Sequence, residues 1–65
     1  MKIRVNGKDL HLGDSATLAE VLEKMEIPKK FIAVEKNGEL IEGDPANCVL
    51  AEGDCLEIAR FVGGG

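Results

Sequence analysis

The chain has 65 residues and a formal net charge of −4, with 45% hydrophobic and 31% charged residues. This length leaves room for one small domain, and the balance of apolar and charged residues excludes a disordered chain. The acidic balance, with Lys29-Lys30 as the one pair of adjacent basic residues, argues against nucleic-acid binding. No apolar stretch approaches the roughly 20 residues that span a bilayer, so we expect no membrane association and a cytoplasmic location.

Residues 1–12 predict a β-hairpin. The apolar residues of MKIRV and DLHL alternate with polar ones, which is the period-two pattern of strands with one buried face. Asn6-Gly7 lies between the two runs and suits a two-residue turn with positive φ at both central positions.

Residues 17–26 predict an amphipathic helix. Its apolar residues recur at helical spacing, and they are Leu18, Val21, Leu22 and Met25. Thr17 and Glu20 have the spacing of a capping box, and Ser15 is the alternative N-cap. Pro28 prevents the helix from continuing.

Residues 31–36 (FIAVEK) predict a strand, because β-branched and aromatic residues dominate them. Asn37-Gly38 then leads into residues 39–41 and predicts a second hairpin. We expect Phe31 to join the core at the start of a central third strand. Residues 42–54 contain two turn signals around a short apolar piece, which indicates a connection with a brief helical turn or a bridge.

Residues 55–62 (CLEIARFV) predict the last strand. The parity expected to face the core comprises Leu56, Ile58 and Val62. The opposite parity, expected to form an apolar surface beside the chain end, comprises Cys55, Ala59 and Phe61. Two interpretations of Phe61 stay open at this point, since an aromatic residue is as readily packed under a loop as exposed.

These elements predict an α+β fold in which one helix covers one face of a four- or five-stranded sheet, because the apolar helix stripe and the strands have only each other to bury against. The other sheet face meets solvent or a partner. Residues 1–62 are expected to form the domain. The glycines at 63–65 are expected to form a flexible tail, because glycine offers no side chain to pack and loses the most entropy on ordering.

The stretches VNG, ATLAEVLEKM, IAVEKNGELI and EGDCLEIARFVGGG together resemble the thiamine-pathway sulfur carriers of the ThiS/MoaD group over essentially the whole chain. The resemblance implies a ubiquitin-like β-grasp fold with a mixed sheet, whose first and last strands lie parallel at its centre. It also implies a protein that is a carrier and a substrate, not an enzyme, with no bound cofactor and a monomeric free state.

The resemblance places the chemistry on Gly65. An E1-like, ThiF-like adenylyltransferase uses ATP to adenylate its carboxylate, and a sulfur donor such as a cysteine desulfurase then supplies the sulfur of a thiocarboxylate. A ThiG-like thiazole synthase receives that sulfur. Gly63 and Gly64 would present the terminus, and the partner-binding residues expected beside it are Phe61, Ala59, Arg60 and Val62.

The other chemically active side chains are expected to be structural. Cys48 and Cys55 match no zinc or redox spacing and are predicted to be reduced and partly buried. His11 has no nucleophile beside it and is predicted to lie on the surface of a strand. Three alternatives stay open: a carrier for molybdopterin or amino-acid biosynthesis, a β-grasp interaction module with a chemically silent end, and a frayed glycine end with no role.

Overall fold

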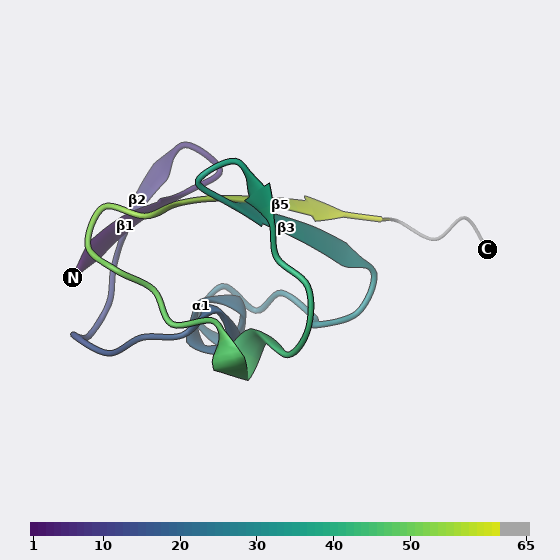
Figure 1. Ribbon diagram of the computed structural model, residues 1–65, viewed down its shortest axis with the longest axis horizontal. Coiled ribbons are helices and arrows are strands. Elements are labelled where there is room, and N and C mark those ends of the chain that lie inside the picture. The colour runs from purple at the N-terminus through teal and green to yellow at the C-terminus, as the bar shows by residue number, and fades with distance from the viewer. Residues whose placement is uncertain (62–65) are drawn as a thin grey trace.

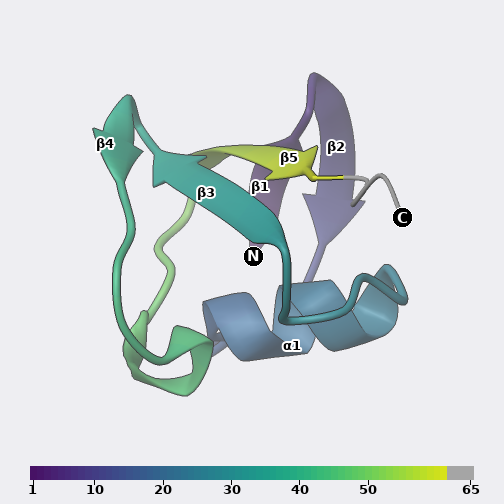
Figure 2. The same cartoon turned by 90° about the vertical axis from the view of Figure 1, so that its right-hand side faces the viewer.

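The computed structural model describes residues 1–61, which form a five-stranded sheet with one α-helix packed against one face (Figures 1 and 2). The strands are β1 (Lys2–Val5), β2 (Lys8–His11), β3 (Ile32–Lys36), β4 (Glu39–Leu40) and β5 (Cys55–Arg60). The helices are α1 (Leu18–Lys24) and a short 3-10 helix, η1 (Pro45–Asn47). The predicted α+β class, with one helix on one sheet face, is confirmed.

The last strand lies at the centre of the sheet, whose order is β2-β1-β5-β3-β4. β5 runs parallel to β1, with Arg4 opposite Cys55, and antiparallel to β3. The expectation of a mixed sheet with parallel first and last strands is therefore confirmed. The predicted third strand, β3, is an interior strand paired with β5 on one side and β4 on the other, and the middle position belongs to β5, which the crossover through α1 and the second hairpin inserts between β1 and β3.

Both predicted Asn-Gly turns are present. Asn6 and Asn37 have φ values of 51° and 52°, and the glycines that follow have φ values of 83° and 87°. Positive φ at both central positions is the geometry that a two-residue hairpin turn requires, and its twist matches that of the flanking strands. Each hairpin is therefore specified locally by two residues.

The helix is shorter at both ends than predicted. Thr17 is the extended N-cap, and its Oγ1 accepts a hydrogen bond from the Glu20 amide at 3.4 Å. At the other end Glu26 takes a left-handed φ of 57°, and the Ile27 amide donates to the Leu22 carbonyl at 2.8 Å. This pattern is that of a Schellman motif, with Glu26 in the place where glycine is usual.

The core lies between α1 and the inner face of the sheet. Its buried residues are Ile3, Val5, Leu18, Val21, Leu22, Val34, Leu50, Leu56 and Ile58. The predicted inward parity of β5 is confirmed for Leu56 and Ile58. Met25 is 38% exposed, and it is the C-cap of α1 and not part of the helix itself.

The connection before β5 contains both features expected of it. A turn of 3-10 helix, η1, is followed by an isolated bridge between Thr17 and Val49. The Leu18 amide donates to the Cys48 carbonyl at 2.9 Å, and the Leu50 amide donates to the Ala16 carbonyl at 3.0 Å. These bonds hold the connection beside the start of α1, as Figure 2 shows.

Asp54 is the buried acidic residue directly before β5. Its carboxylate accepts hydrogen bonds from the Ala51 amide at 2.8 Å and from Asn37 Nδ2 at 3.0 Å. Burial alone would raise the pKa of Asp54, but these two bonds and the nearby charge of Lys36 outweigh it and lower the pKa below its ordinary value. The charged form therefore stabilises the native fold.

This interaction predicts a pH dependence of stability. Because the pKa of Asp54 is lower in the folded chain than in the unfolded one, its contribution is complete above about pH 4 and is lost as the pH falls through the folded value. In Asp54→Asn the free energy of unfolding should fall less steeply below pH 4 than in the wild type. Urea denaturation followed by circular dichroism, from about pH 2 to about pH 7, covers the range in which carboxyl groups titrate. It measures how steeply the free energy of unfolding of each protein changes with pH, and parallel curves would contradict the assignment.

Candidate functional site at the end of the last strand

The site is the end of β5 and the loop beside it. Figure 1 shows β5 running from the centre of the sheet toward the C-terminal end, away from the N-terminus. The Ile58 amide donates to Asn6 Oδ1 at 2.7 Å, and Asn6 Nδ2 donates to the Ile58 carbonyl at 3.1 Å. The Asn6 side chain thus extends the pairing of β1 with β5 beyond the end of β1. Sequence reasoning identified Asn6 as a turn residue but missed this role, because its partner lies 52 residues away.

The other side of β5 pairs with β3 as far as residue 61. Ile32 lies opposite Arg60, and the Phe61 amide donates to the Phe31 carbonyl at 2.7 Å. The β3 side therefore holds β5 up to residue 61, whereas the β1 side holds it, through Asn6, up to Ile58.

The prediction that Phe31 lies in the core is wrong. Its side chain is 73% exposed, and it stands just before β3 with a left-handed φ of 60°. A positive φ breaks the alternation of inward and outward side chains, so the pattern of FIAVEK does not govern the direction of its first residue. The core interpretation of Phe61 is also excluded, since that side chain is 60% exposed.

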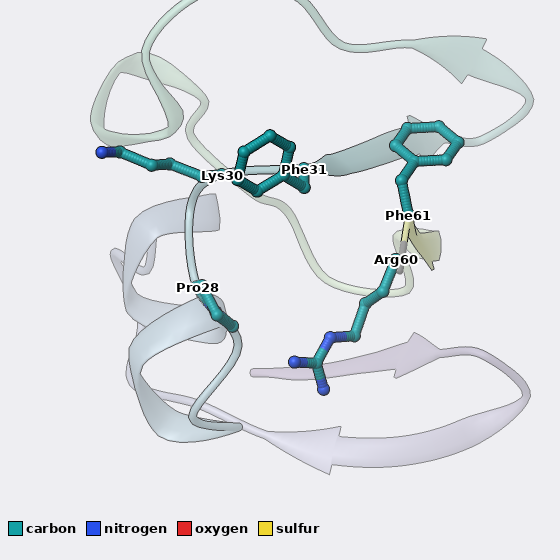
Figure 3. Close-up of a pocket in the computed structure, with 5 residues that line it drawn as sticks. All are labelled: Pro28, Lys30, Phe31, Arg60 and Phe61. Atoms are coloured by element: carbon teal, nitrogen blue, oxygen red, sulfur yellow. The ribbon is translucent and has the colours of Figure 1, made fainter. Parts of the chain in front are cut away.

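The predicted partner-binding residues within the described chain are all on the surface. Ala59 and Arg60 are exposed, and Ala59 lies opposite Ala33 of β3. Figure 3 shows Arg60 pointing toward Pro28 and Phe61 pointing away from it. A cavity of about 280 Å³ lies here, lined by Pro28, Lys30, Phe31, Arg60 and Phe61. Val62 and the predicted tail, residues 63–65, lie outside the described residues, as does the predicted boundary between domain and tail.

Figure 2 shows that one face of the sheet is turned away from α1, and the residues on this open face differ in character along the strands. Ala33 and Ala59 lie side by side near the chain end, and Glu35 lies opposite Glu57 next to them. Like charges directly opposite across two strands are destabilising. Toward β2, Asp9 lies 3.7 Å from Arg4 Nε, so the charges there are paired. The outward parity predicted for Ala59 and Phe61 is thereby confirmed.

The remaining reactive side chains lie apart from this site. Cys48 and Cys55 are free thiols, each half-buried. His11 is exposed on β2, as predicted. In residues 1–61 no three His, Cys, Asp or Glu side chains gather as metal ligands. Neither helix of that part of the chain is long and apolar enough to cross a membrane.

The chain has similar proteins among those already known. The ThiS family model matches residues 3–65. The sulfur carrier protein ThiS of Bacillus subtilis is 35% identical over 65 residues, covering 97% of this chain and 98% of the relative. A thiazole synthase of Paramagnetospirillum magneticum is 33% identical over 66 residues, which cover the whole chain and 20% of the relative. The chain therefore spans about a fifth of that protein.

The solved structures agree with the sequence relatives. The crystal structure of the thiamine biosynthesis protein ThiS from Geobacter metallireducens has a TM-score of 0.80 and 30% identity, and the alignment covers all of both chains. The solution structure of the same organism's thiamine biosynthesis protein has a TM-score of 0.76 and 30% identity, covering the whole of this chain and 88% of the other. The ubiquitin-like β-grasp fold expected from the resemblance is confirmed.

Proposed function

This chain belongs to the ThiS family, and from that membership we propose that it carries sulfur for the thiazole-forming step of thiamine biosynthesis. The observation that carries the proposal is the family match, which runs through Gly65 and so includes the glycine stretch on which the chemistry depends. The role is that of a small carrier protein and not of a catalyst.

The carrier group is the carboxylate of Gly65. An α-carboxyl group has an ordinary pKa of about 3.5, so it is an anion at neutral pH and a poor electrophile. Activation requires that a carboxylate oxygen attack the α-phosphorus of ATP and displace pyrophosphate, giving an acyl adenylate. The outer sulfur of a persulfide on a donor such as a cysteine desulfurase then attacks the acyl carbon and displaces AMP, which leaves the chain joined to the donor by an acyl disulfide. A reducing thiol cleaves that S–S bond, so that the donor leaves as a thiolate and the chain keeps the sulfur as a thiocarboxylate.

Glycine suits this work for a steric reason. The terminus has to approach the nucleotide and the backbone of an enclosing active site, and a Cβ at Gly64 or Gly65 would obstruct that approach and restrict φ and ψ. Gly63 serves as a spacer. Holding the sulfur in a covalent bond also prevents its loss as free sulfide.

Two enzymes are the proposed partners. An E1-like adenylyltransferase uses ATP to activate the terminus, so we place the reaction in the cytoplasm. A thiazole synthase then accepts the sulfur. The relative from P. magneticum supports the second partner, since a protein named thiazole synthase contains a segment similar to the whole of this chain.

The surface that meets these enzymes is proposed to include Phe61, Ala59 and Arg60 of the described chain, together with Val62. The three described residues are exposed and adjoin the point where the tail begins. Exposed aromatic and arginine side chains are typical anchors of protein interfaces. The proposed free state is a monomer.

Intact-mass spectrometry tests the proposal. The purified chain is incubated with an E1-like adenylyltransferase of the ThiF type, ATP and a sulfur donor, and it should gain the mass difference between sulfur and oxygen. A reaction without ATP is the control, and it should leave the mass unchanged. A chain whose mass stays constant in the complete mixture would contradict the carrier role and favour a β-grasp module that only binds.

A further inference from the structure

Asn6 and Asn37, the first residues of the two hairpin turns, hold β5 from opposite sides. Asn6 follows β1, and its backbone amide donates to the Leu56 carbonyl at 2.9 Å. Its side chain accepts from the Ile58 amide and donates to the Ile58 carbonyl. Asn6 therefore makes three hydrogen bonds to β5, two of them through its side-chain amide.

Asn37 repeats this arrangement at the start of β5. Its backbone amide donates to the Cys55 carbonyl at 2.8 Å, and its Oδ1 accepts from the Cys55 amide at 2.9 Å. Its Nδ2 donates to Asp54 Oδ1 at 3.0 Å. The side-chain amide of Asn37 thus joins the β3–β4 turn both to the backbone of β5 and to the carboxylate that precedes it.

The turns themselves do not require asparagine. Asp-Gly and Gly-Gly also adopt positive φ at both central positions of a two-residue hairpin turn. The contacts with β5 do require an amide, because an amide offers a donor and an acceptor together, whereas an ionised carboxylate only accepts. These contacts therefore place a side-chain amide directly before Gly7 and directly before Gly38.

An asparagine that precedes glycine is open to a spontaneous reaction. The glycine nitrogen attacks the side-chain carbonyl carbon of the asparagine, and a C–N bond forms. Ammonia leaves, taking up the proton that the glycine nitrogen loses to water, and a five-membered cyclic imide remains. Water then adds to either carbonyl of the imide and opens the ring to aspartate or isoaspartate. Glycine favours the ring closure because it has no Cβ to obstruct it.

The native hydrogen bonds oppose this reaction at both turns. Ring closure brings the amide group to the glycine nitrogen and breaks the bonds of that amide to β5, so the turn has to open locally first. The two turns differ in what holds them closed. β4 has two residues, both exposed, at the edge of the sheet, and it pairs with β3 at two positions (Figure 2). β2 pairs with β1 at four positions, so the turn at Asn37 is expected to open more often than the turn at Asn6.

The product at Asn37 also meets a second carboxylate. Deamidation replaces Nδ2, which lies 3.0 Å from Asp54 Oδ1, by a carboxylate oxygen, and Asp54 is buried. Two carboxylates that share a buried site repel each other. At Asn6 the same change faces the Ile58 carbonyl, which carries no formal charge, so a hydrogen bond is lost without a second charge beside it.

We propose that Asn37-Gly38 is the deamidation site of the native chain, and that its conversion releases the start of β5 from the β3–β4 turn. The reaction consumes water and needs no enzyme, and the opening of that turn sets its rate. This inference follows from the fold and is independent of the carrier function.

Peptide mapping by mass spectrometry tests the site. The chain is incubated at mildly alkaline pH with and without urea, and the conversion of each asparagine to aspartate and isoaspartate is followed. The ratio of the rate in urea to the rate without urea measures how far the fold protects each site. This ratio should be about tenfold or more at Asn6 and smaller at Asn37. A ratio at Asn37 that equals or exceeds that at Asn6 would overturn the assignment.

Urea denaturation of variants at neutral pH tests the consequence. Asn37→Asp reproduces the aspartate product and should lower the urea midpoint. Adding Asp54→Asn should raise that midpoint again, because the amide and the carboxylate exchange places and can form their hydrogen bond in the opposite direction. Asn6→Asp is the matched control, and Asp54→Asn should lower its midpoint further. If Asp54→Asn lowers the midpoints of Asn37→Asp and Asn6→Asp alike, the repulsion is absent and the proposed release of β5 fails.

Discussion

A variant with one alanine added after Gly65 is expected to form thiocarboxylate about a hundredfold or more slowly than the wild type, and this is the largest functional effect that we predict. The added residue moves the reactive carboxylate by one residue and places a Cβ beside the attacking oxygen. Misplacement of a reacting group by about 1 Å already lowers rates on the order of a hundredfold. The rate of activation of the extended chain should therefore fall by about a hundredfold or more, because the proposed reaction takes place at the terminal carboxylate and depends on its position.

Intact-mass spectrometry after reaction with the activating enzyme, ATP and a sulfur donor measures this effect. The matched control carries one alanine inserted after Met1, which leaves the terminus as it is and should gain sulfur like the wild type. Its circular dichroism spectrum, and that of the extended chain, should match the wild-type spectrum. Sulfur found on the extended chain with its alanine still attached would contradict the proposed role of Gly65.

Replacing Leu56 by alanine is expected to have the largest effect on stability. Leu56 is fully buried, with 0% of its surface exposed, and it lies on the central strand opposite Val5 of β1 and Lys36 of β3. Leu→Ala substitutions at buried sites cost about 2–5 kcal/mol. A single core in a domain of this size rarely supplies more than about 3–5 kcal/mol. The variant should be largely unfolded at about 37 °C, because a loss of this size lowers the thermal midpoint of a small domain by tens of degrees.

Urea denaturation followed by far-ultraviolet circular dichroism measures this loss, since a chain without Trp or Tyr has little intrinsic fluorescence. Leu40→Ala is the matched control, because Leu40 is exposed on the edge strand β4. Its free energy of unfolding should stay within about 0.5 kcal/mol of the wild type. Equal urea midpoints for the two variants would contradict the central role of β5.

The elements were predictable where a short stretch decides its own conformation. Asn6-Gly7 and Asn37-Gly38 adopt positive φ without help from the rest of the chain, so both hairpins were placed correctly. The Thr17 side chain caps an amide only three residues further along the chain, so the start of α1 could be predicted from the sequence. The end of α1 was harder to predict, because Glu26 stands at the position where a glycine usually marks the end of a helix.

The side chains that complete the site were less predictable. Phe31 was assigned to the core because aromatic residues usually pack, whereas its left-handed backbone turns the ring outward. The hydrogen bonds of Asn6 to Ile58 and of Asn37 to Asp54 join residues 52 and 17 positions apart. No local pattern reports such contacts, because each member alone is compatible with many partners.

The amino-acid sequence by itself therefore determined the hairpins, the helix, the inward parity of Leu56 and Ile58 in β5, and the family resemblance from which we propose the glycine terminus as the reactive end. The tertiary structure decided that β5 lies between β1 and β3. It also decided that Phe31, Phe61, Lys30 and Arg60 line one cavity where β5 ends. The reason is the range of the forces involved. Turn, cap and alternation preferences act over a few residues, whereas the neighbours of a strand in a sheet come from segments that only folding brings together.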